Sequence, residues 1–204
     1  MLEAQQLAAQ RGSATLFTGI DFTLKSGEAL LITGANGSGK TTLLKIVAGL
    51  VHPAAGALIW RGTAVTPFAP DARATTLYIG HATALKDELT AEENLASLAR
   101  LHGAAVDAAA VGDALRAWTL EPQRALGARV LSQGQRRRVG LARLRLVHRP
   151  LWVLDEPTTA LDSSGVATLQ EALAAHLARG GIAVIATHQD LALPVGSRRE
   201  LRLQ

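Results

Sequence analysis

A glycine-rich segment lying between two apolar runs constrains the fold of this chain more than any other feature. Positions 34 to 41 match every fixed position of a phosphate-binding loop, and they read Gly34-Ala35-Asn36-Gly37-Ser38-Gly39-Lys40-Thr41. The apolar run at 29–33 predicts a buried strand before the loop, and the apolar spacing at 42–48 predicts a helix after it. Glycines let the backbone N–H groups converge on phosphate oxygens at the positive end of that helix. A glycine-rich turn without a ligand is the alternative, and the complete match disfavours it.

The loop also assigns roles to individual side chains. Lys40 is predicted to reach the β- and γ-phosphates of a nucleotide, and the Thr41 hydroxyl is predicted to ligate Mg²⁺. We expect the nucleotide to be bound by Gly34, Ala35, Asn36, Gly37, Ser38, Gly39, Lys40, Thr41 and Thr42.

A second apolar run, at 151–154, ends in two carboxylates, Asp155 and Glu156. Ligands of open α/β sheets bind beyond the carboxyl ends of the strands, so both side chains are expected near the phosphate loop. Asp155 fits the role of a Mg²⁺ ligand, and Glu156 fits that of a general base acting on water. An ordinary acidic turn is the alternative, and the phosphate loop makes the catalytic interpretation the better one.

Length and patterning predict one α/β domain spanning residues 1–204. The first 31 residues alternate as β-strands do, and further strands are expected at 57–60, 77–79, 151–154 and 182–186. Continuous apolar strands of this kind predict a parallel sheet covered on both faces. Helical spacing at 91–101 and 106–118 predicts a helical subdomain at about 83–150, inserted in a core formed by 1–82 and 151–204.

Composition excludes several classes of function. The chain has no cysteine, which rules out disulfides, thiolate metal sites and Cys-x-x-Cys-His haem attachment within it. Aromatic residues make up 3% of the chain, which argues against a stacking platform for nucleic acid. We see no basic and apolar secretory signal at 1–6 and no apolar run of membrane-spanning length, so any membrane contact is expected through partners.

The basic excess, a formal net charge of +4, is concentrated in arginines, notably at 136–138. Such a run could face phosphate, an acidic partner or lipid headgroups, although it is more commonly a solvated helix face.

The segment Leu131-Ser132-Gln133-Gly134-Gln135 resembles the Leu-Ser-Gly-Gly-Gln signature of the ATP-binding cassette (ABC) ATPases, with Gln133 in place of the first glycine. A basic, apolar-striped helix is expected after it, at 136–147. The resemblance implies a phosphate-loop NTPase fold of the ABC type, with an N-terminal β-rich subdomain and an inserted helical subdomain. It also implies ATP and Mg²⁺ as ligands. It further implies a homodimer in which the ATP held by one subunit is contacted by Ser132, Gln133, Gly134 and Gln135 of the other. The alternative is that this segment is an ordinary N-terminal helix cap that does not contact ATP.

Other positions resemble further segments of this family. Asp162, in Ala160-Leu161-Asp162, resembles the D-loop, and His188 resembles the switch histidine that contacts the γ-phosphate. Two positions depart from the pattern. Arg11 occupies the place of the adenine-stacking aromatic, and a guanidinium can stack on a base with looser selectivity. Ala82 occupies the place of the Q-loop glutamine, with His81 as the nearest polar substitute or a merely exposed histidine.

Within the family, the chain is similar to the ATPase subunits of haem exporters that act in cytochrome c biogenesis. The similarity is carried by the segments at 16–24, 79–95 and 136–144 and by the Gly180-Gly181-Ile182 and Thr187-His188-Gln189 runs. It implies a CcmB-like membrane subunit, with CcmC-, CcmD- and CcmE-like proteins, at the cytoplasmic face of a bacterial inner membrane. Three alternatives stay open: a transporter ATPase for lipid, metal or peptide, a soluble non-transport cassette ATPase, and a nucleotide-binding regulator that hardly hydrolyses ATP.

Overall fold

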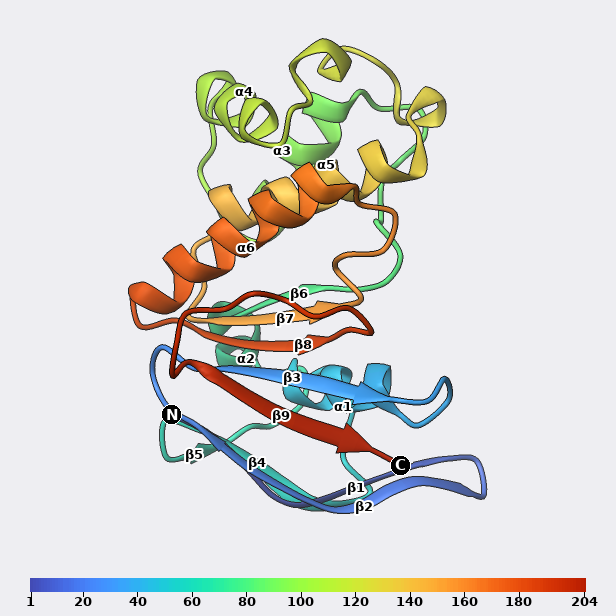
Figure 1. The fold of residues 1–204 in the computed structure, drawn as a ribbon, viewed down its shortest axis with the longest axis vertical. Helices are drawn as coiled ribbons and strands as arrows, with labels where there is room; N and C mark the ends of the chain where they lie inside the picture. The colour runs from blue at the N-terminus through green and yellow to red at the C-terminus, as the bar shows by residue number, and fades with distance from the viewer. The chain divides into compact units, whose positions relative to one another are not determined.

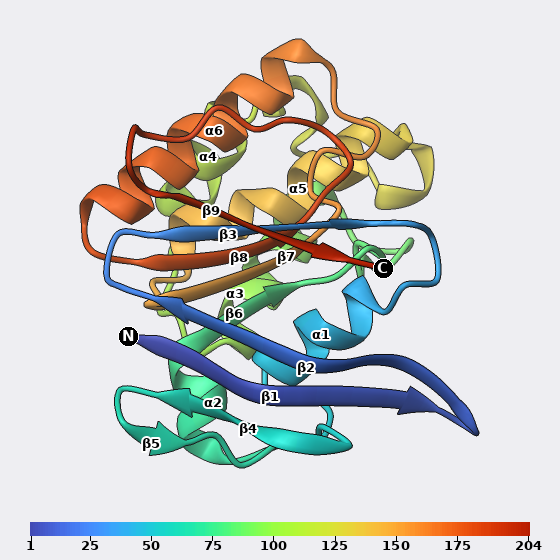
Figure 2. The same ribbon diagram turned by 60° about the horizontal axis from the view of Figure 1, so that its bottom comes forward.

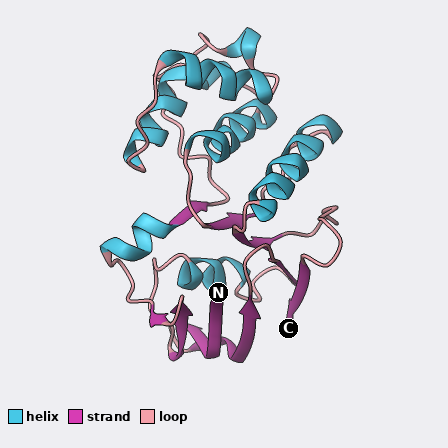
Figure 3. Ribbon diagram, turned by 90° about the vertical axis from the view of Figure 1, so that its left-hand side faces the viewer, coloured by secondary structure: helices cyan, strands magenta, loops and turns pink.

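The computed structural model describes residues 1–204, which form two units. The first unit comprises Met1–Tyr78, Arg149–Glu156 and Leu173–Gln204, and the second comprises Ile79–His148 and Pro157–Ala172. Figure 3 shows that the strands gather in the first unit, whereas the second is built mainly of helices. No helix combines the length and the apolar character that crossing a membrane would require.

An antiparallel sheet is formed by the N-terminal part of the first unit (Figure 1). Its strands, in the order β2-β1-β4-β5, are β2 (Ala14–Leu24), β1 (Leu2–Arg11), β4 (Ala55–Trp60) and β5 (Thr63–Ala64). Burial alternates at the start of β1, where Leu2 and Ala4 are buried, and after a register shift between Ala4 and Leu7 the strand also buries Leu7.

The second sheet carries the candidate site. Its strands, in the order β6-β7-β8-β3-β9, are β6 (Thr76–Ile79), β7 (Leu151–Asp155), β8 (Ile182–Ala186), β3 (Ala29–Gly34) and β9 (Arg198–Leu203). β3 pairs in parallel with β8, and β7 also pairs in parallel with β8. Every residue of β7 and β8 is buried, which confirms the parallel sheet predicted from their continuous apolar runs.

The last core strand predicted from the sequence, at 182–186, is not the last strand of the sheet. β9 follows it and pairs in parallel with β3, from Ala29 opposite Arg198 to Gly34 opposite Leu203. Its sequence, Arg198-Arg199-Glu200-Leu201-Arg202-Leu203, is mostly charged because β9 lies at the sheet edge and buries only Leu203 fully. An edge strand of this kind lacks the continuous apolar run that identified its neighbours.

Helix α1 (Lys40–Val47) packs in the core of the first unit, between its two sheets (Figure 2). Leu43, Leu44, Ile46 and Val47 are at most 2% exposed and contact core residues from both sheets. This packing fixes the start of α1, and therefore the phosphate loop, against the carboxyl ends of the parallel strands. A shorter helix, α2 (Pro70–Thr75), precedes β6.

Three helices form the core of the second unit, namely α3 (Ala91–Leu101), α4 (Ala108–Ala117) and α5 (Gln133–Leu146). Two short 3₁₀ helices, Glu121–Gln123 and Ala128–Val130, connect α4 to α5, and α6 (Ser163–Ala178) begins in this unit and ends in the first. Thr90 caps α3 through a reciprocal bond with Glu93, and Asp107 caps α4, as these residue types do at helix starts. Leu95, Leu115 and Trp118 are at most 1% exposed and anchor the core.

A buried histidine of α6, His176, packs against Trp152 of β7 in the parallel sheet. The rings of Trp152 and His176 are stacked, with centroids 3.9 Å apart and planes 6° from parallel. His176 is 5% exposed, and its Nε2 lies 3.2 Å from the carbonyl oxygen of Ile182. Burial, with a smaller contribution from the nearby Arg179, lowers the pKa of His176 to about 4, and the bond to Ile182 opposes this shift.

This histidine predicts acid sensitivity. As the pH falls below about 6.5, the unfolded chain binds a proton at His176 that the folded chain takes up only near pH 4. The free energy of unfolding should therefore fall through this window, by up to about 3 kcal/mol. Urea titrations at pH 7.5 and 5 would measure the loss in the wild type and in His176→Gln, which cannot titrate. An equal loss in both proteins would contradict the assignment.

Candidate nucleotide-binding site

The phosphate loop connects the carboxyl end of β3 to the first residue of α1. Gly34, Gly37 and Gly39 have φ angles of 148°, 88° and 96°, which favour glycine, and Gly39 is the N-cap of α1. The loop thereby curls in front of a helix N-terminus, where free N–H groups and the helix dipole attract an anion. The predicted strand, glycine loop and helix are all present in the structure.

Two polar side chains of the loop are buried within it. The Lys40 ammonium, on a side chain that is 8% exposed, donates to the carbonyl oxygens of Gly34 and Ala35 at 2.8 and 3.0 Å. It therefore lies across the start of the loop. The Ser38 hydroxyl oxygen is buried without a hydrogen-bond partner, so the loop presents a polar group that a ligand could satisfy. Asn36 and Thr41 are exposed, and Thr42 is half-buried.

Thr41 and Asp155 are joined directly, although they are 114 residues apart in the chain. The Thr41 hydroxyl donates to Oδ2 of Asp155 at 2.9 Å. Asp155 is the last residue of β7 and is 2% exposed. Burial, with a smaller contribution from the Asp155 charge, raises the pKa of the neighbouring Tyr78 to about 12, so its phenol stays protonated. The two residues predicted to ligate magnesium are therefore brought together.

Glu156 and His188 also meet at the carboxyl edge of this sheet. The Glu156 N–H donates to the Ala186 carbonyl oxygen at 2.9 Å, which holds Glu156 beside the end of β8. Its Oε1 lies 3.3 Å from Nε2 of His188, and its φ of 47° is a left-handed conformation that is strained for glutamate. Strain of this kind is often retained at functional sites, where the surrounding structure holds it.

Gly34 is predicted to be the least replaceable residue of the loop. A Cβ there would lie 2.5 Å from the Leu203 carbonyl oxygen and 2.8 Å from the Ser38 hydroxyl, whereas a Cβ at Gly37 would meet nothing within 4 Å. Gly34→Ala should lower the free energy of unfolding by about 3 kcal/mol, and Gly37→Ala, which pays backbone strain alone, by about 1 kcal/mol. Denaturant titration of both variants would measure this difference, and equal losses would contradict the close approach of β9.

In the second unit, the signature-like segment starts a helix. Ser132 is the N-cap of α5: its hydroxyl accepts from the Gln135 N–H, while the Gln135 side chain accepts from the Ser132 N–H. The helix predicted at 136–147 therefore begins earlier, at Gln133, because this reciprocal cap includes the signature residues in its first turn. Gln133 needs no left-handed backbone, so the family's first glycine is replaced here without strain.

The remaining signature residue and the D-loop are in contact. A Cβ on Gly134 would lie 2.7 Å from the Ala160 carbonyl oxygen, so the absence of a side chain permits this approach. Asp162 accepts from the Gly165 N–H and the Ser164 hydroxyl at 2.8 Å, which caps the first turn of α6. The Gly165 N–H, then Ser164, and then the ion pair with Arg138 lower the pKa of Asp162 to about 2.

The arginine run at 136–138 is not a solvated helix face. Arg136 donates to Asp87 and to the Ala128 carbonyl, Arg137 is 3% exposed, and Arg138 pairs with Asp162. Sequence reasoning overlooked Arg137 and Arg138 as candidate functional residues. Three consecutive arginines next to the signature were the available signal, since arginine suits buried, multiply bonded positions better than lysine does.

The positions that depart from the family pattern lie at exposed sites. Arg11 ends β1 at the turn into β2, where it pairs with Ala14, and its side chain is exposed. His81 and Ala82, just after β6, are also exposed. Nothing in this geometry assigns a function to the His81 or Arg11 side chains, and their roles stay predictions.

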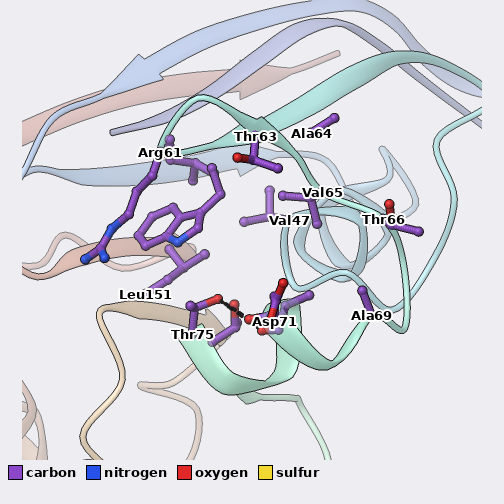
Figure 4. Close-up of a pocket in the computed structure, with 14 residues that line it drawn as sticks. Val47, Arg61, Thr63, Ala64, Val65, Thr66, Ala69, Asp71, Thr75 and Leu151 are labelled. Carbon is purple, nitrogen blue, oxygen red and sulfur yellow. Dashed lines mark hydrogen bonds between the residues drawn. The ribbon is translucent and has the colours of Figure 1, made fainter.

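A separate cavity of about 410 Å³ lies in the first unit, between the β4–β5 hairpin and α2 (Figure 4). It is lined by Leu2, Trp60, Arg61, Val65, Asp71 and Thr75, among others, and by none of the phosphate-loop residues. The Arg61 guanidinium lies 5.3 Å from the centre of the Trp60 ring. The dashed line in Figure 4 marks the bond that the Thr75 hydroxyl donates to the Asp71 carbonyl.

Comparison with known proteins agrees with this geometry. The family described as ABC transporter matches residues 17–159, which include the phosphate loop, the signature-like segment and both carboxylates. The chain is 46% identical over 203 residues, the whole of both proteins, to the cytochrome c biogenesis ATP-binding export protein CcmA of Dechloromonas aromatica. The chain belongs to the CcmA group of ABC transporter ATP-binding proteins. It is also 50% identical over 191 residues to CcmA of Aromatoleum aromaticum, covering 93% of this chain and 89% of the relative.

Solved structures of ABC ATP-binding proteins confirm the fold. An ABC transporter ATP-binding protein from Pyrococcus furiosus has a TM-score of 0.84 and is 26% identical, covering 99% of this chain and 96% of that one. A dimeric ATP-binding cassette in a post-hydrolysis state, bound to ADP and Pi, has a TM-score of 0.77 and is 25% identical, covering 93% and 88%. As a member of this ABC family, the chain is an ATP-binding protein with the predicted antiparallel β subdomain, parallel α/β core and helical insert.

Proposed function

We propose that this chain is the ATP-hydrolysing subunit of a haem exporter that acts in cytochrome c biogenesis. The observation that carries the proposal is the convergence of the phosphate loop, Asp155, Glu156 and His188 at one edge of the parallel sheet. The full-length similarity to cytochrome c biogenesis export proteins supports the choice of pathway.

The phosphate loop would hold the triphosphate of ATP. N–H groups at the start of α1 donate to phosphate oxygens, and the Lys40 ammonium, already folded over the loop, neutralises the β- and γ-phosphates. The Ser38 hydroxyl, which is buried without a partner, supplies a further donor. Arg11, exposed at the β1–β2 turn, would stack on the base through its guanidinium.

The donor set at Thr41 and Asp155 fits magnesium. A hydroxyl and a carboxylate oxygen, 2.9 Å apart, are the hard oxygen ligands that Mg²⁺ prefers. Mg²⁺ commonly keeps several waters and is bound by one or two protein ligands together with substrate phosphates, which is the number of ligands that Thr41 and Asp155 offer. When bound, Mg²⁺ would neutralise charge on the phosphates.

Glu156 would act as the general base. Its carboxylate accepts a proton from the water that attacks the γ-phosphorus in line with the leaving ADP. His188, with Nε2 3.3 Å from the Glu156 carboxylate, lies beside this base, and its ring N–H would donate to the γ-phosphate. The hydrogen bond that the Glu156 N–H donates to the Ala186 carbonyl holds Glu156 beside the end of β8.

The ATP site of a second copy of the chain would be completed by the signature-like residues Ser132, Gln133, Gly134 and Gln135. The Ser132 hydroxyl oxygen accepts from Gln135, which leaves its own proton available to donate to a phosphate oxygen. The N–H groups at the start of α5 add to this anion site. The similar cassette whose structure is dimeric supports the pairing of two chains. The proposed pair is head-to-tail around two ATP molecules, with Asp162 near the interface.

We propose a CcmB-like membrane subunit as the direct partner, working with CcmC-, CcmD- and CcmE-like proteins at the cytoplasmic face of the inner membrane. Affinity purification of a tagged CcmB-like subunit, expressed with this chain, tests the assignment. We expect the chain to be retained, and its ATPase rate to change when haem is added to the complex. Retention by an unrelated lipid, metal or peptide permease, without retention by the CcmB-like subunit, would favour a different transporter.

A further inference from the structure

Two segments of the chain leave the first unit and enter the second at the carboxyl ends of neighbouring strands. One follows β6, which ends at Ile79, and the other follows β7, which ends at Asp155. The second unit therefore begins at Ile79, the last residue of β6, and begins again at Pro157. Pro157 is bonded directly to Glu156, so its position bears on that of the proposed general base.

Arg137 joins these two entry segments within the second unit. Its Nη1 donates to the carbonyl oxygens of Gly80 and His81 at 2.8 and 3.2 Å, and its Nε donates to that of Pro157 at 3.3 Å. The side chain is 3% exposed. A buried guanidinium is costly unless its N–H groups are bonded, so these contacts favour one conformation of all three segments.

The helix that carries Arg137 also carries the signature-like segment. Arg137 lies in α5, whose first turn is capped by Ser132. The planar guanidinium offers five N–H donors in a fixed arrangement, and lysine or glutamine cannot reproduce this set of bonds. Because the acceptors are main-chain carbonyls, the connection does not depend on the side chain at position 82, where alanine stands in place of glutamine.

We propose that Arg137 is a positioning residue for ATP hydrolysis, which ties the segments after β6 and β7 to the helix that begins at Ser132. A displacement of Glu156 by nucleotide then moves Pro157, and Arg137 passes this movement to α5 and to the segment after β6. The inference rests on the proposed ATPase activity. It predicts that Arg137 sets the rate of hydrolysis and has little effect on the capture of ATP by the phosphate loop.

The test compares the same change at two arginines of α5. Arg145 is exposed and one residue from the end of the helix, so Arg145→Met is the control for Arg137→Met. In the purified full-length chain, we expect Arg137→Met to lower kcat for ATP about tenfold with KM within about twofold of wild type, as loss of transition-state positioning does. Arg145→Met should change neither quantity by more than about twofold.

Two further measurements separate the possible outcomes. Arg137→Lys keeps the positive charge but loses the planar set of N–H donors, so we expect a kcat between those of wild type and Arg137→Met. If Arg137→Met does not fold, Arg137→Lys takes its place in the comparison. Amide hydrogen exchange reports on the two tied segments independently of ATPase activity. We expect it to be faster at residues 80–84 and 158–162 in the Arg137 variants than in Arg145→Met. Wild-type kcat and exchange rates in a folded Arg137 variant, or kcat and KM that worsen together, would overturn the proposal. A wild-type chain that binds ATP without hydrolysing it would instead contradict the proposed ATPase function.

Discussion

The Glu156→Gln variant is expected to bind ATP within about threefold of wild type and to hydrolyse it about 10³-fold more slowly, the usual scale for losing a general base. Glutamine has the shape of glutamate, so the contact with His188 and the N–H bond to Ala186 can persist. Its amide cannot accept a proton from water, so only the chemical step is removed. Calorimetry for ATP binding and phosphate release for turnover would measure the two effects separately.

Because ATP would persist in this variant, it is also expected to accumulate as an ATP-bound dimer. Light scattering after gel filtration with saturating ATP and Mg²⁺ would measure the mass. Glu171→Gln, an exposed change on α6, is the control and should remain as active as wild type. A Glu156→Gln protein that stays monomeric under these conditions would contradict the pairing of two chains around ATP, and full activity would remove Glu156 as the base.

The Lys40→Ala variant is expected to lose about 100-fold in affinity for ATP. Lys40 is the buried cation of the phosphate loop, and charge-assisted bonds to phosphate contribute about 3 kcal/mol, which corresponds to roughly a hundredfold in Kd. Calorimetric titration with ATP would measure the loss. Lys45→Ala is the matched control, because Lys45 is an exposed lysine on the same helix.

Thermal unfolding of both lysine variants separates binding from stability. Lys40 also donates to the carbonyls of Gly34 and Ala35, so some loss of stability is expected in its variant. A Lys40→Ala protein that is folded and binds ATP as wild type does would show that the loop holds no triphosphate.

The elements with strong local signals were predictable from the sequence. The continuous apolar runs of β7 and β8 predicted a buried parallel sheet, and the helical spacing of α3 gave its bounds at Ala91 and Leu101. β9 was not predicted because an edge strand has few buried positions and a charged sequence. The start of α5 was placed too late, although Ser132 and Gln135 have the spacing of a reciprocal cap and the sequence therefore contained the signal.

The candidate site was predictable where residues follow strands directly. Asp155, Glu156 and His188 each follow a predicted strand, so their meeting at one sheet edge follows from the parallel topology. The partners of Arg137 and Arg138 were not predictable, because they come from distant segments of the chain and depend on tertiary packing. The assigned roles of the site residues and the boundaries of the helical subdomain stay predictions.

Isothermal calorimetry of the purified chain with ATP and Mg²⁺ tests the central claim most directly, namely that the loop before α1 captures a nucleotide triphosphate. The account predicts measurable heat with one ATP bound per chain in the wild type and in Lys45→Ala, and almost none in Lys40→Ala at the same concentrations. Absence of heat from the wild-type protein, or equal binding by all three proteins, would contradict it.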